Sequence, residues 1–127
     1  MKTIRIVLVL TLICSQGCEP TPTNKPDPNV KVELLKFEAV WCGPCREQKP
    51  IIEQLKKEFP TVEFLAIDTD QNANMSALYH VSRLPTLVIL VNGREAMRYT
   101  GLQSHGTLKN ALNRATTGKL VPASNAN

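Results

Sequence analysis

Cys42 and Cys45 are the two residues of this 127-residue chain that point most clearly to a chemical reaction. They enclose Gly43 and Pro44, follow Trp41, and stand between an apolar, strand-like stretch and an amphipathic helical one. A C-x-x-C between a strand and a helix is typical of a redox-active dithiol. The unpaired N–H groups and the positive dipole end of a helix would stabilise a thiolate on the first cysteine. The two-residue spacer would let the second sulfur reach a mixed disulfide formed on the first.

Zinc binding is the alternative use of a C-x-x-C motif. A structural zinc site needs four ligands, which are usually cysteine and histidine. The remaining cysteines, Cys14 and Cys18, lie in the N-terminal segment, and His80 and His105 are singly placed without ligand spacing. The sequence therefore predicts neither a metal site nor a cofactor.

Composition predicts a single globular domain without a nucleic-acid surface. Apolar residues make up 43% of the chain and charged residues 20%, and the net charge is +4. Two of the basic residues, Lys2 and Arg5, lie in a segment that we expect to be removed; from Cys18 onward, 13 basic residues stand against 11 acidic ones. These basic residues are scattered rather than clustered, so the sequence predicts no nucleic-acid partner.

Residues 1–17 have the layout of a signal peptide. Lys2 and Arg5 precede the apolar run 6–13, which is far shorter than the roughly 20 apolar residues of a permanent membrane span. A buried core helix or strand is the alternative, but the positive flank and the polar residues that follow favour export. We therefore expect an extracytoplasmic protein.

Cys18 is a candidate site of lipid attachment. Gly17 and Cys18 resemble a bacterial lipobox, in which a small residue precedes the acylated cysteine, whereas Ser15 replaces the usual leucine. A soluble secreted form is the alternative. Residues 18–30 are rich in proline and lack large apolar side chains until Val30, so we expect an extended linker that tethers the domain to a membrane.

Residues 31–116 carry the periodicities of a mixed α/β domain. Strands are expected at 30–39, 62–67, 86–91 and 95–100, with the hairpin signal Asn92-Gly93 between the last two. Helices are expected from the cysteine motif to Pro60, after a cap at Asp70 or Asn72, and after Ser104 or His105. The order β-α-β-α-β-β-α predicts a mixed four-stranded sheet with helices on both faces. Residues 117–127 are expected to form a polar, disordered tail.

The short second helix contributes Met75, Leu78 and Tyr79, which we expect to be core contacts. No coiled-coil pattern or conspicuous apolar face is present, so the sequence predicts a monomer.

Several short motifs of this chain occur together in one known family: Trp41 to Cys45, Pro50, Asp70 to Asn72, Arg83 to Thr86, Asn92-Gly93 and Gly101. At these positions, residues 31 to about 116 resemble thioredoxin. The resemblance implies a minimal thioredoxin fold, because the linker occupies the place of the strand and helix with which that family begins. The strand at 30–39 would then lie nearer a sheet edge than usual.

The resemblance also implies roles for individual residues. Cys42 would be the attacking thiolate and Cys45 the resolving cysteine. Pro85 would be cis and lie against the dithiol, although a trans proline would be the expectation without the family. The Leu84 backbone would pair with an extended substrate segment. Trp41, beside Gly43 and Pro44, would be a partly exposed surface for partners; simple packing against the sheet edge is the alternative.

The strand before the motif departs from the family. Lys36 stands where thioredoxins carry a buried aspartate that handles the proton of the resolving cysteine, and Glu38 replaces a tryptophan. Because the two residues are two positions apart in a strand, their side chains point to the same face. One hypothesis is that Lys36 and Glu38 form a proton relay with Glu38 as the carrier. The alternative is that both side chains reach solvent and that water carries the proton of the resolving cysteine.

Together these features predict an extracytoplasmic reductase of protein disulfides, because Gly43-Pro44 is the dipeptide of reducing thioredoxins. Its partners would be disulfide-containing proteins and a membrane or other thiol electron donor, since the compartment is oxidising. The alternatives are a disulfide oxidase or isomerase, and a binding module that uses the scaffold without turnover.

Overall fold

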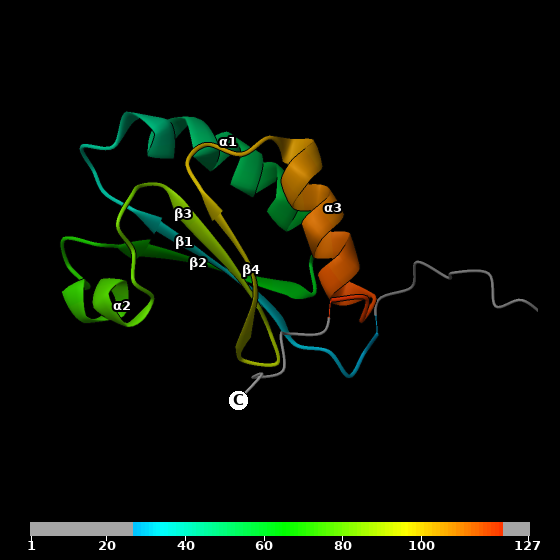
Figure 1. Ribbon diagram of the computed structural model, residues 1–127. Coiled ribbons are helices and arrows are strands. Elements are labelled where there is room, and N and C mark those ends of the chain that lie inside the picture. The colour runs from blue at the N-terminus through cyan, green and yellow to red at the C-terminus, as the bar shows by residue number, and fades with distance from the viewer. Residues whose placement is uncertain (1–26, 121–127) are drawn as a thin grey trace, which may run out of the picture.

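The computed structural model describes residues 27–120 and contains a four-stranded sheet covered by three helices (Figure 1). The predicted order β-α-β-α-β-β-α is confirmed. The elements are β1 (Val32–Glu38), α1 (Gly43–Glu58), β2 (Val62–Asp68), α2 (Ala73–Leu78), β3 (Thr86–Val91), β4 (Arg94–Thr100) and α3 (His105–Thr116).

The sheet has the strand order β2-β1-β3-β4. β1 pairs in parallel with β2, as a strand–helix–strand unit requires, and antiparallel with β3, which pairs antiparallel with β4. The strand that carries the cysteine motif at its end is therefore an inner strand, bonded on both sides, and only β2 lies between it and the sheet edge. All six residues of β3 are buried, in accordance with its continuous apolar run.

Two helices, α1 and α3, cover one face of the sheet (Figure 1). Their apolar stripes meet alternate residues of the central strands, because strand side chains alternate between faces. Leu55 and Leu112 are fully buried in this cluster and pack with Leu34 and Ile89 of the sheet. This layer fixes the position of α1, the helix at whose start the cysteines lie.

The short helix α2 lies on the opposite face, where Met75 and Tyr79 pack against a second cluster that includes Phe37. These two core contacts are confirmed, and the rings of Phe37 and Tyr79 are 5.5 Å apart. The expectation for Leu78 is wrong, since 69% of it is exposed. The buried side of this six-residue helix is set by Met75 and Tyr79, four residues apart, and Leu78 falls outside it.

The turn and cap signals are partly confirmed. Asn92 and Gly93 both have positive φ, 52° and 76°, as a tight hairpin turn requires. The Ser104 side chain accepts from the N–H of Thr107 and caps α3. Asn72 stands at the N-cap of α2 but makes no capping bond, because its amide donates to the carbonyl of Asp68 instead.

Both ends of the described chain pack near the C-terminus of α3. The N–H of Asp27 donates to the Thr116 carbonyl over 2.9 Å, so the last linker residues form a turn there. Leu120 packs against the core, so the segment expected to be a disordered tail begins with ordered residues. The signal segment 1–17 and Cys18 lie outside the described residues. Within residues 27–120, no helix is long and apolar enough to cross a bilayer.

An ion cluster joins the end of α1 to the first two turns of α3. The Glu58 carboxylate accepts from Lys109 over 2.8 Å and contacts Nε2 of His105 at 2.7 Å. The hydrogen bond from Lys109, assisted by His105, lowers the pKa of Glu58 below its usual value. Glu58 therefore contributes stability in its ionised form.

We expect Glu58→Gln to lower the free energy of unfolding at neutral pH and to have no effect in strong acid. A carboxylate with a lowered folded-state pKa stabilises above its unfolded pKa of about 4.3, and the gain is lost as the pH falls through the folded pKa. Urea unfolding of both proteins across this range measures the difference. Glu47→Gln, at an exposed position of the same helix with no ion pair within residues 27–120, is the control. A difference that persists in strong acid would contradict this account of Glu58.

Candidate active site

Cys42 and Cys45 form a disulfide at the start of α1, with an S–S distance of 2.10 Å. Cys42 is the N-cap residue of this helix, and its sulfur accepts from the N–H of Cys45 over 3.2 Å. Pro44 stands in the first turn, where its missing N–H costs no hydrogen bond. The Cys42 sulfur therefore accepts a hydrogen bond from one of the unpaired N–H groups at the start of the helix. After reduction, these N–H groups favour the thiolate form of Cys42.

The two cysteines open toward different hollows. Cys42 lines a groove of about 400 Å³ together with residues of the motif, the turn after β2, α2 and the loop before β3. Cys45 lines a second hollow of about 250 Å³. Cys42 is absent from the lining of the second hollow, and Cys45 from that of the groove. The groove is lined by Trp41, Cys42, Gly43, Pro44, Thr69, Ser76, Val81, Ser82, Arg83 and Leu84.

Trp41 is an exposed wall of the groove. It is 69% exposed, so simple packing against the sheet edge is wrong for this residue. Its indole Nε1 donates to the Asp70 carboxylate over 2.9 Å, which orients the ring from the turn after β2. This contact was not predicted: Asp70 was expected only as a helix cap and as one of the positions that match the thioredoxin pattern.

The loop before β3 lies against the disulfide. The Leu84–Pro85 peptide bond is cis, as the resemblance implies. Leu84 packs against the small cluster formed by Ala39, Cys42 and Cys45. The loop is bonded to the segment after β4, where the N–H of Gly101 donates to the Pro85 carbonyl over 2.8 Å.

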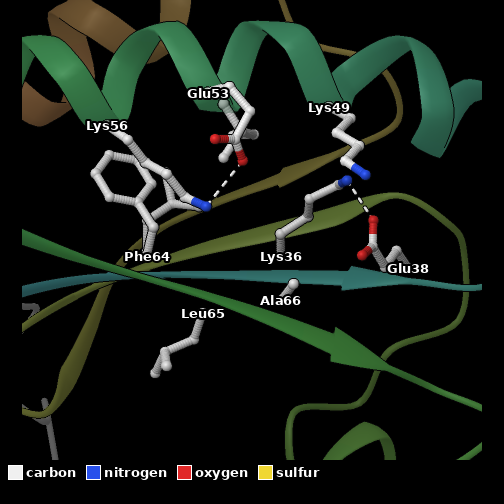
Figure 2. Close-up of a pocket in the computed structure, with 10 residues that line it drawn as sticks. Lys36, Glu38, Lys49, Glu53, Lys56, Phe64, Leu65 and Ala66 are labelled. Carbon is white, nitrogen blue, oxygen red and sulfur yellow. Dashed lines mark hydrogen bonds and ion pairs between the residues drawn. The ribbon is translucent and has the colours of Figure 1, made fainter.

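Lys36 and Glu38 form an ion pair next to the second cysteine (Figure 2). Lys36 is only 4% exposed, so the alternative in which both side chains reach solvent is wrong for this residue. Its amine donates to the Glu38 carboxylate and, over 3.2 Å, to the backbone carbonyl of Cys45. The side chain of Glu38 is 32% exposed.

A buried glutamine holds α1 against the segment after β4. The Gln48 side chain accepts from the Gln103 N–H over 2.7 Å and donates to the Gln103 carbonyl over 3.2 Å. Gln48 lies on the buried stripe of α1, three residues after Cys45. Sequence reasoning missed it, although a polar residue on an apolar helix stripe was an available signal. Through Gln103 and the neighbouring Gly101, Gln48 ties the helix of the dithiol to the loop of Pro85.

Within residues 27–120, no three side chains of histidine, cysteine, aspartate or glutamate are grouped as metal ligands. In the same range, every buried side-chain nitrogen or oxygen has a hydrogen-bond partner. The chemistry that this site can perform with its own residues is disulfide exchange.

We expect Gln48→Leu to lower the free energy of unfolding by about 1–3 kcal/mol, because the half-buried N–H of Gln103 loses the acceptor that the buried Gln48 side chain provides. Urea unfolding of the oxidised protein measures this change. Gln54→Leu makes the same substitution at an exposed position of α1 and should change stability by less than about 0.5 kcal/mol. Equal effects of the two substitutions would show that the Gln48 bonds do not support the site.

Comparison with known proteins agrees with this geometry. The family model described as Thioredoxin matches residues 25–114. A thioredoxin from Chlamydia pneumoniae is 41% identical over 81 residues, which cover 64% of this chain and 79% of the relative. The structure of Fasciola hepatica thioredoxin has a TM-score of 0.63 at 38% identity, and a thioredoxin variant from Halobacterium salinarum has 0.66 at 35%. These two alignments each cover 72% of this chain, and 84% and 79% of the respective structures. The chain belongs to the thioredoxin family of protein-disulfide oxidoreductases.

Proposed function

We propose that this protein reduces disulfide bonds of other proteins outside the cytoplasm. One observation carries the reaction: Cys42 lines the groove, whereas Cys45 opens to a different hollow. An extended substrate segment in the groove, between Trp41 and Leu84, meets the sulfur of Cys42 first. The Gly43-Pro44 spacer, which reducing thioredoxins carry, supports the reductive direction.

The reaction proceeds by two exchanges. The Cys42 thiolate attacks one sulfur of the substrate disulfide, the substrate S–S bond breaks, and the departing sulfur leaves as a thiolate that takes a proton. The Cys45 sulfur then attacks Cys42 in the mixed disulfide and releases the second substrate sulfur. The Cys42–Cys45 disulfide that forms has given two electrons to the substrate, and a thiol electron donor must reduce it again.

Reduced Cys45→Ser protein should accumulate a mixed disulfide with a substrate such as insulin, because the second exchange cannot occur. Cys42→Ser keeps one cysteine of the motif and should form little adduct, since the remaining cysteine, Cys45, does not line the groove. Non-reducing electrophoresis and mass spectrometry of the adduct measure both.

With dithiothreitol as electron donor, wild type should catalyse the reduction of insulin and neither variant should. No turnover by wild type would favour a binding module, and a reduction potential well above that of glutathione would favour an oxidase.

The extracytoplasmic location is proposed from residues 1–18 alone, which combine a positively charged start, a short apolar run and Gly17-Cys18. When the full chain is expressed in a bacterium, we expect wild type in the membrane fraction. Cys18→Ala should appear in the soluble extracytoplasmic fraction, while Cys14→Ala, the matched control, should behave as wild type. Fractionation and the mass of the mature N-terminus measure these outcomes. An unprocessed chain in the cytoplasm would contradict the proposal.

A further inference from the structure

Lys36 is a buried amine beside the dithiol that the two exchanges leave without a role. An ammonium group is costly to bury unless it is paired and hydrogen-bonded. Both of its partners, the Glu38 carboxylate and the Cys45 carbonyl, lie on the side of the second cysteine. The ion pair is therefore tied to the first turn of α1 through the Cys45 carbonyl.

The hollow at Cys45 brings the cysteine and the carboxylate together. Glu38 and Cys45 both line this space of about 250 Å³, which is roomy enough for several water molecules. Glu38 keeps 32% of its side chain exposed, so its carboxylate is accessible to water although its lysine partner is buried. Water in this hollow would contact both Glu38 and Cys45.

Charged groups from three elements surround Glu38. Lys36 lies on the same strand, and the Lys49 amine of α1 points toward the pair in Figure 2. Arg46 of α1 and Asp68 of β2 also line the hollow. Asp68 is the rival carboxylate, but its side chain accepts from the N–H of Asp70 over 2.9 Å and from the Gln71 amide over 3.4 Å, so it supports the turn after β2.

We propose that Glu38 is the acid–base group of Cys45, acting through water in this hollow, and that Lys36 is the positioning residue that holds it there. The inference rests on the proposed disulfide exchange. In the second exchange, the Cys45 thiol gives its proton through water to the Glu38 carboxylate, and the resulting thiolate attacks the Cys42 sulfur. The Cys42–Cys45 bond forms as the mixed disulfide breaks. The substrate thiolate leaves, and Glu38 returns the proton to it or to water.

Glu38 acts only in the second exchange, because Cys42 opens to the groove and does not line the hollow of Glu38. Rapid mixing of the reduced protein with dithionitrobenzoate, a disulfide that releases a coloured thiolate, separates the two steps. The first coloured thiolate leaves when Cys42 attacks. The second leaves when Cys45 displaces it from the mixed disulfide.

We expect Glu38→Gln to leave the first release unchanged and to slow the second by about 100-fold at neutral pH, the usual scale for losing a general base. The defect should shrink as the pH rises past about 8.5, where an ordinary cysteine ionises without help. Glu38→Asp should restore part of the rate. Lys36→Met should slow the second release and spare the first, because Glu38 loses the amine that positions it.

Glu53→Gln is the matched control. It removes a carboxylate from the wall of the neighbouring pocket, where Glu53 accepts from Lys56 over 2.8 Å, and it should change neither release (Figure 2). A normal first release in each variant shows that the motif remains folded. A second release within about twofold of wild type in Glu38→Gln at all pH values would overturn the inference. So would a slow second release in Asp68→Asn with a normal one in Glu38→Gln. Failure of the first release in wild type would instead contradict the proposed exchange at Cys42.

Discussion

The hydrogen bond from the N–H of Cys45 to the Cys42 sulfur joins the redox centre to the start of α1. It makes one side chain both the cap of α1 and a reactive atom, so the start of the helix and the redox centre cannot be positioned separately. The sheet and α3 hold the helix from below and from the side through a continuous apolar layer. Gln48 then fixes its rotation relative to the segment after β4. The sheet and helices together therefore position the two cysteine sulfurs at the start of α1.

The two cysteines receive different surroundings from this arrangement. The side of Cys42 is wide and is bounded by the exposed Trp41 and by Leu84, which suits a polypeptide. The hollow at Cys45 is smaller and is lined by charged groups, and the buried Lys36 donates a hydrogen bond to the carbonyl of the cysteine itself. Lys36 of β1 therefore contacts Cys45 of α1 directly, although nine positions separate the two residues in the sequence.

Much of the fold was predictable because its signals are local. The apolar run of β3, the Asn92-Gly93 turn and the Ser104 cap depend on neighbouring residues, and each lies where the sequence pattern predicts it. Leu78 was misjudged because a helix of six residues has too few positions to define a buried side from periodicity.

The parts of the site that were missed depend on contacts between distant segments. Asp70 reaches the indole of Trp41 across 29 positions, and Gln48 reaches Gln103 across 55. No local pattern specifies such pairs. The pairing of Lys36 with Glu38 was foreseeable from strand alternation, but the burial of Lys36 was not, because the neighbouring α1 causes it.

The bond from Asp27 to Thr116 has a consequence for access to the dithiol. It places the start of the described chain beside the C-terminal end of α3, whereas α1 begins at the opposite end of the molecule (Figure 1). A membrane attachment upstream of Asp27 would therefore hold the molecule at the end of α3, which is the end farthest from Cys42. The dithiol would face away from the attached surface, toward proteins that approach from the open compartment.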